Sequence, residues 1–484
     1  MTRDRWLWAV LLLGAALRLY GLGERSLSYD ECQQFWASQG SFLISNREIT
    51  LDPPLFPALL HLHSLVGRSE TWLRLLPCLL GILGIPAVYV LGYRLAGDRL
   101  TARVAAFFFS LAPYPIRYSQ SLRVYSLTLW LCALLLAAWL AALENNNPHR
   151  RWCVAALAGL GLLAMYGVVW LAGALLAVLL FLPALRKVPG RVRLACTLGA
   201  GMAAAVPLYV ISLPTQMAQG TPPTFYEDKF LPRDSLPGAL EFLGKGTLDL
   251  FGYYSFIHPA SGALFGALAV LGMIRLGRTR EVSASVGVFV VAVAGAAAAS
   301  ALRLYPFGAT RQMLYAAPLF YVFAAGGITS LRSWVRGWVT AILLAVIAAG
   351  CGVFLYRYHR EPGGQEMRPV ANYLAHHAQS GDRILVNKDA IPQFRFYYHG
   401  DPEAVTWGRE TVIRDYVAEV NDVIDSAPPR RWWLVFSHGW TEDRRARLMA
   451  VDARFVLTDR FEAHRAAAYL FAPRAEGASA PPER

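Results

Sequence analysis

The sequence predicts an α-helical membrane protein that crosses the bilayer about eleven times and ends in a small soluble α/β domain. Three observations predict this fold class. Of the 484 residues, 55% are hydrophobic and 16% are charged, which is more apolar surface than a soluble core of this size normally buries. Apolar runs of membrane-spanning length recur through the first 356 residues, with basic loops between them. After residue 356 the composition becomes polar and charged.

The net charge and the cysteines argue against two other classes of protein. A net charge of +13 would suggest a nucleic-acid partner in a soluble protein, but many of the basic residues here lie in short loops between apolar runs. That placement indicates membrane topology, and we expect no nucleic-acid partner. The six cysteines form no CxxC pair and none follows Cys351, so we expect neither a disulfide framework nor a zinc site.

The first predicted span covers residues 6–22. Arg3 and Arg5 precede it, as in a signal peptide, but no clear cleavage site of small residues follows. We therefore interpret it as a retained signal anchor with a cytoplasmic N-terminus. Eight further runs are each read as one span, at residues 73–95, 104–118, 124–143, 194–213, 256–274, 282–302, 313–331 and 337–356.

The run at residues 152–182 is long for one span and short for two. Two short spans that turn near Met165, Tyr166 and Gly167 would return the basic loop at residues 186–193 to the cytoplasm, so the positive-inside rule favours two. With that count, the basic loops all fall on the cytoplasmic side. The outer side receives the loops at residues 23–72 and 214–255, together with the C-terminal domain.

The C-terminal domain is predicted at residues 357–484, after a membrane domain at residues 1–356. Short β-like runs, "RILVN", "RWWLVFSH" and "AAAYLFAP", alternate with helical stretches such as "MRPVANYLAHHA". This alternation predicts a small α/β module. The last ten residues, "AEGASAPPER", are predicted to be disordered.

An Asp-Glu pair follows the first span, in "SLSYDECQQFW". Ser28 and Glu31 fit a capping box, in which the glutamate reaches back to the start of a helix, and this structural reading alone would explain the pair. The helix that follows is predicted to be amphipathic and to lie in the membrane interface, with Asp30, Gln33, Gln34 and Ala37 away from its apolar face. Asp30 would then face a polar cleft at the membrane surface.

Further motifs in the same order resemble a known group of enzymes. "LDPPLFPALLHLHS" follows the acidic pair, "RLLP" opens the second span, and "YSQSLRVY" follows the third. Their order resembles the GT-C glycosyltransferases that use lipid-linked sugars, namely the protein O-mannosyltransferases, the lipid A aminoarabinose transferases and the related bacterial lipopolysaccharide-core glycosyltransferases. "YPFGATRQMLYAAPLF" and the C-terminal module also resemble this group. The likeness covers about 360 residues in layout and is specific over about the first 125.

The resemblance implies a bacterial cytoplasmic (inner) membrane enzyme with its site on the outer side. It would transfer a monosaccharide from a polyprenyl-phosphate carrier to an acceptor hydroxyl, with inversion at the anomeric carbon. Such a reaction needs one base and several cations at the departing phosphate. The resemblance assigns Asp30 as the base and Glu31 as the residue that positions the acceptor or supports Asp30.

Arginines and tyrosines on the outer side are the candidates for the donor phosphate. Arg123 and Arg311 are the leading candidates because they lie in tight turns that match the family, although interfacial arginines often only contact lipid headgroups. Tyr118 and Tyr125 could bond the phosphate or stack on the sugar, although aromatic belts explain many such residues. The weaker phosphate candidates are Arg74, Arg117 and Lys245.

Two positions depart from the family pattern, and the metal requirement is open. Ser121 stands where relatives often carry Glu, which weakens the assignment of a second acidic role to that turn. Asp52 stands where relatives often have His or another polar residue, and we expect it to cap the next helix. We find no metal-binding motif on the outer loops and assign no metal ligand, although some relatives use a divalent metal.

Three other functions are compatible with parts of the sequence. A transporter would be expected to show two similar halves with broken helices, and no such repeat is seen. A polysaccharide ligase or polymerase would carry one very long outer loop between late spans, whereas the long loops here come early and in the middle. A non-catalytic scaffold that displays the C-terminal domain is the third. The sequence indicates neither the sugar, the acceptor nor the oligomeric state.

Overall fold

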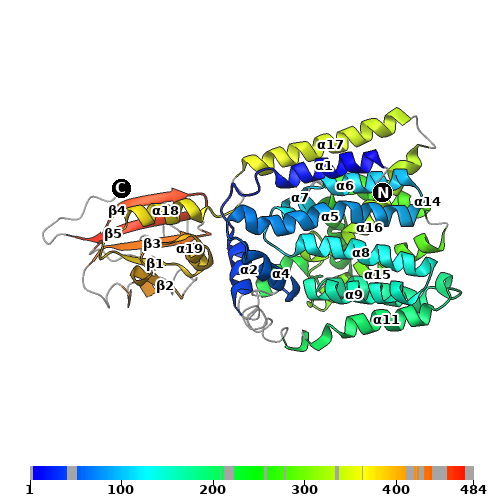
Figure 1. The fold of residues 1–484 in the computed structure, drawn as a ribbon, viewed down its shortest axis with the longest axis horizontal. Coiled ribbons are helices and arrows are strands. Elements are labelled where there is room, and N and C mark those ends of the chain that lie inside the picture. Colours follow the sequence, from blue (N-terminus) through cyan, green and yellow to red (C-terminus); the bar gives the residue numbers. More distant parts are fainter. Residues whose placement is uncertain are drawn as a thin grey trace. The chain divides into compact units, whose positions relative to one another are not determined.

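A computed structural model of the chain divides into two compact units (Figure 1). The first unit comprises Met1–Leu22 and Ala37–Tyr358, and the second comprises Gly23–Trp36 and His359–Arg484. The residues that the structure describes are 4–40, 52–207, 209–211, 223–255, 259–276, 279–332, 337–361, 364–409, 419–420, 422–423, 430–438 and 455–474. The predicted disordered tail at residues 475–484 lies outside them, as do parts of both predicted outer loops.

The first unit is helical. Its α-helices are α1 Arg5–Leu19, α4 Leu55–Ser64, α5 Glu70–Ala96, α6 Arg99–Leu111, α7 Pro113–Ser119, α8 Tyr125–Glu144, α9 Pro148–Ala164, α10 Val168–Phe181, α11 Arg191–Ala203, α13 Leu236–Tyr254, α14 Pro259–Leu276, α15 Arg280–Ala301, α16 Ala317–Leu331 and α17 Gly337–Arg360. Short 3-10 helices are η1 Pro183–Leu185, η2 Pro223–Lys229 and η3 Arg311–Ala316.

A helix lies within every predicted apolar run, but the number of spans is not fixed at eleven. Among the described residues, five helical segments are long and apolar enough to cross a membrane, namely Glu70–Ala96, Tyr125–Glu144, Arg280–Ala301, Arg311–Leu331 and Gly337–Arg360. Two shorter apolar helices are Val168–Phe181 and Ala260–Leu276. The chain is thus a multi-pass membrane protein, and the count of eleven stays a prediction. The division of residues 152–182 is confirmed, because α9 ends at Ala164 and α10 begins at Val168.

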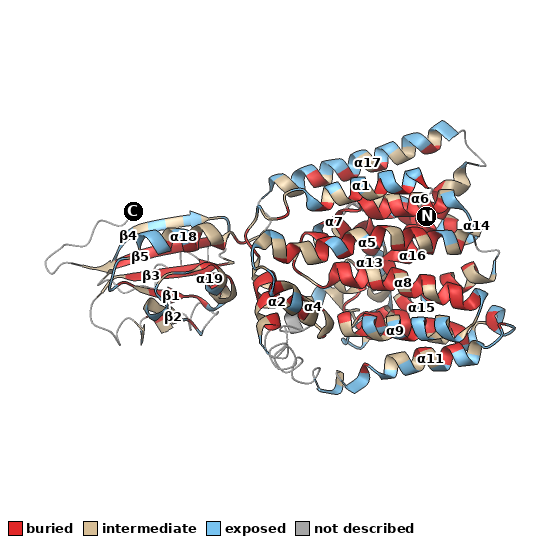
Figure 2. Ribbon diagram, in the orientation of Figure 1, coloured by how far each residue is buried: buried red, intermediate tan, exposed pale blue. Residues whose placement is uncertain are grey.

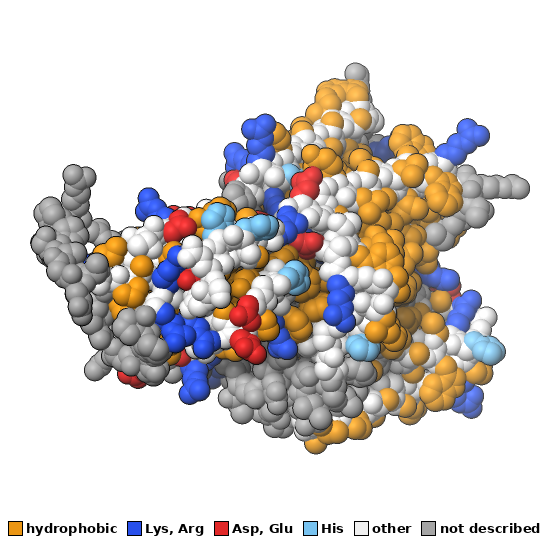
Figure 3. Space-filling model, turned by 60° about the vertical axis from the view of Figure 1, so that its left-hand side comes forward, with side chains coloured by type: hydrophobic (Ala, Val, Ile, Leu, Met, Phe, Trp, Pro, Cys, Tyr) orange, Lys and Arg blue, Asp and Glu red, His pale blue; other side chains and the backbone are white. Residues whose placement is uncertain are grey.

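The helices differ in how far they are enclosed (Figure 2). In α8 and in the segment Arg311–Leu331, 83% of the apolar window is buried, against 22% in α17. α8 and α16 therefore form the centre of the helical unit, whereas α17 presents apolar side chains outward. Figure 3 shows hydrophobic side chains covering broad areas of this unit's surface, as expected for a face in contact with lipid.

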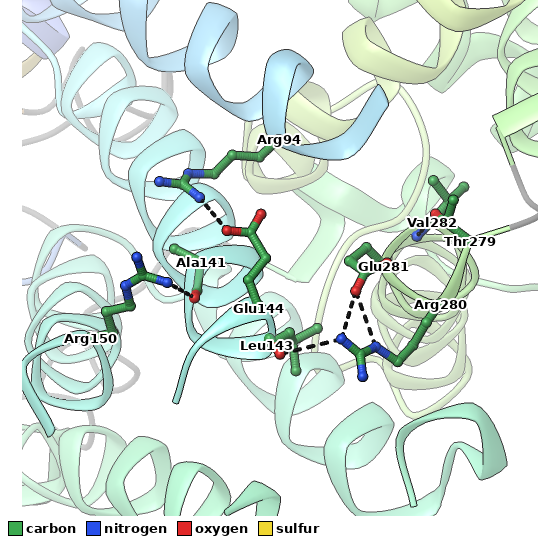
Figure 4. Close-up of polar contacts among 9 residues, drawn as sticks. All are labelled: Arg94, Ala141, Leu143, Glu144, Arg150, Thr279, Arg280, Glu281 and Val282. Atoms are coloured by element: carbon green, nitrogen blue, oxygen red, sulfur yellow. Dashed lines mark hydrogen bonds and ion pairs between the residues drawn. The ribbon is translucent and has the colours of Figure 1, made fainter. Parts of the chain in front are cut away.

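The basic loops that we expected on one side of the membrane lie together (Figure 4). Arg94 pairs with Glu144 at 2.9 Å, at the C-terminal end of α8. Arg150 donates to the carbonyl oxygen of Ala141, and Arg280 donates to that of Leu143 at 3.4 Å. These carbonyls belong to the last turn of α8, where a cation is favoured by the helix dipole. Three separate basic loops thus share one end of the helical unit, in agreement with the positive-inside reasoning.

The second unit is built on a five-stranded mixed sheet of order β2-β1-β3-β5-β4. β1 runs parallel to β2 and β3, and the remaining pairs are antiparallel. The strands are β1 Arg383–Val386, β2 Val405–Trp407, β3 Trp432–Ser437, β4 Phe455–Ala463 and β5 Ala466–Pro473, and the helices are α18 Met367–His377 and α19 Ile391–Tyr397. The three strands and the helix expected from the sequence are confirmed as β1, β3, β5 and α18. β2 and β4 were not expected.

The segment at residues 23–36 belongs to the second unit rather than to the helical one. The hydroxyl of Ser26 donates to Glu366 Oε2 at 2.6 Å, and the Gln393 side-chain amide donates to the carbonyl oxygen of Leu27 at 2.9 Å. The Trp36 indole N–H donates to the carbonyl oxygen of Pro392 at 2.9 Å. The predicted membrane domain at residues 1–356 includes this segment. The prediction is wrong here because the segment's partners lie more than 300 residues further along the chain and leave no local signal. Helix α2, Tyr29–Gln39, therefore begins in the second unit and ends in the first.

Candidate functional site

The acidic pair lies at the start of α2, and its two carboxylates have different surroundings. The backbone N–H of Ser28 donates to Glu31 Oε2 at 2.8 Å, and the Cys32 N–H donates to the Ser28 carbonyl at 2.9 Å as the first bond of the helix. Glu31 is buried, with 4% of its surface exposed. The structure therefore confirms the glutamate half of the capping box. The cap is supplied by Glu31, so it does not depend on the carboxylate of Asp30, which is half-buried.

The expectation that α2 has a polar face away from its apolar one is wrong at two of its four positions. Gln34 and Ala37 have no exposed surface, like Cys32 on the apolar side. Helical periodicity depends only on the residues of α2 itself. It does not predict which residues distant in sequence pack on the helix, such as Phe396, whose ring lies edge-on to that of Phe35 with centroids 5.0 Å apart.

Asp30 shares its surroundings with groups from the carboxyl ends of β1 and β3. The Tyr29 ring lies edge-on to the His438 ring, with centroids 4.9 Å apart, and His438 follows β3 with a left-handed φ of 60°. Asp389, in the 3-10 helix Lys388–Ala390 that follows β1, acts electrostatically on both rings, as does Asp30. The carboxyl edge of parallel strands is a common position for binding sites in α/β domains.

Burial controls the ionisation of these two rings. It raises the pKa of Tyr29 to about 12, and the carboxylates of Asp389 and Asp30 act in the same direction. Burial lowers the pKa of His438 below its usual range, against the opposing effect of Asp389 and Asp30. At neutral pH the two rings next to Asp30 are therefore a protonated phenol and a neutral imidazole. Sequence reasoning missed Asp389 and His438, and the only signal was their position directly after β-like runs.

In the first unit, charged side chains gather at the ring of Tyr125, the first residue of α8. Arg123 donates to the Tyr125 hydroxyl at 3.3 Å, and its guanidinium carbon lies 5.7 Å from the ring centre. The guanidinium carbon of Arg311, the first residue of η3, lies 6.0 Å from the same centre. Asp52 Oδ2 lies 3.4 Å from Arg123 Nη2, with both side chains largely buried. We call Asp52, Arg123, Tyr125 and Arg311 the Tyr125 cluster.

A group of stacked tyrosines adjoins this cluster. The rings of Tyr118 and Tyr125 lie 4.4 Å apart, and the Tyr118 hydroxyl is hydrogen-bonded to that of Tyr253, near the end of α13. Tyr114 lies 3.8 Å from the Tyr253 ring. The structure thus brings four predicted residues together, namely Arg123, Arg311, Tyr118 and Tyr125. Sequence reasoning missed Tyr114 on α7, and it missed Tyr253 because α13 falls within the predicted outer loop at residues 214–255.

The Tyr-Ser-Gln motif positions the turn that carries Arg123. The side-chain amide of Gln120 donates to the carbonyl oxygens of Arg18 at 3.2 Å and Tyr20 at 2.7 Å, at the C-terminal end of α1. Arg18, fully buried, donates in turn to the carbonyl oxygens of Phe109 and Ser110 at the end of α6, at 3.0 and 2.9 Å. Carbonyls at helix ends need such donors in an apolar interior. The motif therefore holds the turn before α8 against the end of α1, which Arg18 in turn joins to the end of α6.

The other predicted phosphate ligands are not part of the Tyr125 cluster, although Arg117 acts electrostatically on Tyr114 and Tyr118. Arg74, buried on α5, donates to the carbonyl oxygen of Leu22 at 3.3 Å. Arg117 on α7 and Lys245 on α13 are exposed. The expectation that Asp52 caps a helix is wrong, because α4 starts at the N-cap residue Pro54 without a side-chain cap, and Asp52 pairs with Arg123. The ion pair was not predicted because Asp52 directly precedes Pro53, Pro54 and a helix, which favours a cap, whereas Arg123 is distant in sequence.

The described residues contain no group of three or more His, Cys, Asp or Glu side chains placed to hold a metal ion. Asp52, the carboxylate of the Tyr125 cluster, pairs with an arginine. Nothing in this part of the chain fits a metal site, so we derive no step through a metal.

Comparison with known proteins supports the expected family. Residues 52–211 match the model of the family described as dolichyl-phosphate-mannose-protein mannosyltransferase. ArnT from Cupriavidus metallidurans in the apo state superposes with a TM-score of 0.61 at 14% identity, over 96% of this chain and 97% of ArnT. The same ArnT bound to undecaprenyl phosphate gives 0.62 at 13% identity, over 96% and 98%.

The chain has the GT-C glycosyltransferase fold. The Archaeoglobus fulgidus oligosaccharyltransferase, in a complex with Zn and sulfate, shares this fold with a TM-score of 0.58 at 13% identity, over 89% of this chain and 67% of that one. No curated relative matches the sequence significantly. The family match confirms the resemblance seen in the motifs. It includes Asp52, Arg123 and Tyr125, whereas Asp30 and Arg311 lie outside the matched residues.

Proposed function

We propose that this GT-C protein is an inverting glycosyltransferase that moves a monosaccharide from a polyprenyl-phosphate carrier to a hydroxyl group of a lipid, glycan or protein. The observation that carries the proposal is the Tyr125 cluster, in which two guanidinium groups share one aromatic ring. Arginines suit a lipid phosphate by charge and by bidentate geometry. The structural likeness to ArnT bound to undecaprenyl phosphate supports a donor of this class.

The chemistry is a single displacement. The acceptor oxygen forms a bond to the anomeric carbon as the bond from that carbon to the phosphate oxygen breaks. The electron pair of the broken bond stays on the phosphate, where Arg123 and Arg311 stabilise the added charge. The acceptor proton passes to Asp30, and attack opposite the leaving phosphate inverts the anomeric centre.

Asp30 suits the role of base because another residue makes the helix cap. Glu31 satisfies the Ser28 N–H, so the carboxylate of Asp30 can change its protonation state without loss of that bond. Burial lowers the pKa of the neighbouring His438, so its ring is neutral near pH 7 and adds no positive charge next to Asp30. Glu31 would then hold the start of α2 and so support Asp30, which is one of the two roles that the resemblance implies for it.

We place the reaction at the outer face of a bacterial cytoplasmic membrane, with the C-terminal domain on the same side. The support is the grouping of the Arg94, Arg150 and Arg280 loops at one end of the helical unit, since such loops favour the cytoplasmic side. The Tyr125 cluster lies at the opposite end of α8 from Glu144, because α8 runs from Tyr125 to Glu144. Labelling of the single-cysteine variants Ser121→Cys and Asn146→Cys from each side of the membrane tests this orientation, and labelling of Asn146→Cys from outside would contradict it.

The test of the function is transfer of radiolabelled sugar from a panel of polyprenyl-phosphate monosaccharides. Membranes would carry the wild type, Asp30→Asn, or Asp422→Asn as a matched exposed control in the second unit. We expect turnover with one donor, a loss of at least about 100-fold in Asp30→Asn, and no change in the control. Membrane insertion of all three is confirmed in parallel.

Other outcomes would favour other functions. Equal turnover in the wild type and Asp30→Asn would remove Asp30 from the reaction. Absence of turnover with every donor would contradict monosaccharide transfer and favour a polysaccharide ligase or polymerase, a transporter or a scaffold. Transfer of a long glycan from a lipid-linked donor would then identify the ligase.

A further inference from the structure

The Tyr125 cluster contains a carboxylate in a position where the proposed function calls for cations. Asp52 Oδ2 lies 3.4 Å from Arg123 Nη2, and the two side chains are 15% and 12% exposed. Largely buried ion pairs are little screened by salt, so this contact has an appreciable effect on the local potential. A site built only for tight anion binding would not include it.

Two of the three charged side chains of the cluster are guanidinium cations, and the third is a carboxylate. Arg123 and Arg311 both lie over the Tyr125 ring, and Asp52 offsets one of them. Arg123 is also held by the Tyr125 hydroxyl, which accepts from its Nη2 at 3.3 Å. Arg123 therefore keeps its place at the ring through a neutral partner as well as through Asp52.

The donor and the product of the proposed reaction differ in charge. A polyprenyl-phosphate sugar is a phosphodiester with one ionisable oxygen and one negative charge. Cleavage of the bond to the sugar leaves a phosphomonoester, which carries about −1.5 to −2 near pH 7. Two unopposed arginines would bind this product more tightly than the donor and would slow its release.

We propose that Asp52 sets the specificity of the Tyr125 cluster, so that it accepts a lipid phosphodiester and releases the lipid phosphomonoester. This inference rests on the proposed function and names the selectivity of that same site. Repulsion between Asp52 and the second phosphate charge weakens the binding of the product alone. The ion pair of Asp52 with Arg123 weakens the binding of donor and product alike, because either phosphate must share Arg123 with Asp52.

The experiment compares binding of two defined lipids to the purified full-length protein in nanodiscs of neutral lipid. The probes are undecaprenyl phosphate as the monoester and its methyl ester as the diester, at pH 7.5 and fixed salt. The variants are Asp52→Asn, which removes the charge, and Asp52→Glu, which keeps it. Glu241→Gln on α13 is the matched control, since it removes an exposed carboxylate from the same unit.

We expect the ratio of the affinity for the monoester to that for the diester to be the same in Glu241→Gln as in the wild type. In Asp52→Asn, the affinity for the monoester should rise about tenfold more than the affinity for the diester. Asp52→Glu should keep the wild-type ratio. The gain in Asp52→Asn should largely disappear at pH 5, where the monoester has lost most of its second charge.

Two results would overturn the inference while the proposed function stands. One is an equal change in affinity for both lipids in Asp52→Asn, and the other is weaker binding of both, which would make Asp52 only a support for Arg123. If Asp52→Asn does not insert, the same comparison is made with the wild type alone between pH 5 and pH 8. A monoester that binds much more tightly than the diester at pH 8 would then overturn the inference. Failure of the wild type to bind either lipid would overturn the proposed function as well.

Discussion

The start of α2 and the Tyr125 cluster each carry charged groups to which we assign a role in the proposed reaction, but different kinds of contact build them. The cap of α2 joins Ser28 to Glu31, three residues apart. The Tyr125 cluster joins three segments that carry Asp52, Arg123 with Tyr125, and Arg311, and the adjoining tyrosines add Tyr253 from a fourth. A local contact can be read from a short motif, whereas a contact between distant segments requires the whole fold.

The largest expected effect tests the cluster itself. Arg123→Gln should lower the kcat/KM for the donor by about 100-fold, because it removes a charge-assisted contact to the departing phosphate. Arg123→Lys should lie between this variant and the wild type, since lysine keeps the charge but loses the bidentate geometry. The control is Arg68→Gln, an exposed arginine in the same predicted outer loop as Asp52. An equal loss in Arg68→Gln and Arg123→Gln would show that general positive charge, and not the cluster, matters.

A smaller effect tests whether the distant tyrosine belongs to the same group. Tyr253→Phe removes the hydrogen bond to Tyr118 and keeps the ring that stacks on Tyr114. A hydrogen bond of this kind contributes about 1 kcal/mol, so we expect the KM for the donor to rise about fivefold with little change in kcat. Tyr93→Phe, an exposed tyrosine on α5, is the matched control. A wild-type KM in Tyr253→Phe would restrict the group to residues near Tyr125.

The local cap can be tested separately from the chemistry. Glu31→Ala should destabilise the first turn of α2 by about 1 kcal/mol, because it leaves the Ser28 N–H without its acceptor. Glu31→Gln keeps an acceptor oxygen and should cost less. Hydrogen exchange of the amides at residues 28–36 measures both variants. If Glu31→Gln keeps this protection but loses as much transfer as Asp30→Asn, Glu31 acts in the reaction and not only as a cap.

The smallest expected effect is a pH dependence of stability in the second unit. The folded-state pKa of His438 is lowered, first by burial, so the unfolded chain binds the proton more readily. Stability should therefore be fully present above the ordinary histidine pKa of about 6.5 and should decline as the pH falls below it, towards the lowered folded-state pKa. In His438→Gln, the fall in the unfolding midpoint between pH 7.5 and pH 5.5 should be about 2 °C smaller than in the wild type.

The control and the neighbouring charges matter for this last measurement. The groups that act on His438 are Asp389, Asp30 and Arg465, and the carboxylates oppose the effect of burial. His376→Gln on α18, an exposed histidine, should leave the decline unchanged. An unaltered decline in His438→Gln would assign it to another group.

Local and periodic features of the fold could be predicted from the sequence. Apolar runs located most helices of the first unit, although α4 and α13 lie within the predicted outer loops. The basic loop after residue 182 indicated the break between α9 and α10, and Ser28 with Glu31 indicated the cap. Strands β1, β3 and β5 were visible because their runs are short, apolar and well separated. The motif order also led to the correct fold family.

Long-range pairing could not be predicted from these signals. Asp52 was expected to cap a helix because it precedes one, yet its partner is 71 residues further along the chain. The association of residues 23–36 with the C-terminal domain follows from contacts such as that of Ser26 with Glu366. No helix or strand periodicity and no short motif indicates such a contact, because each partner also fits the sequence pattern of its own segment.

The discontinuous second unit has a practical consequence for domain exchange between relatives. A chimera that replaced only residues 359–484 would separate Ser26 from Glu366 and Trp36 from the carbonyl of Pro392, and it would alter the setting of Asp30 while leaving Asp30 itself unchanged. Loss of activity in such a chimera would then be misread as a change in acceptor preference. The exchangeable cassette is residues 23–36 together with residues 359–484, moved as one.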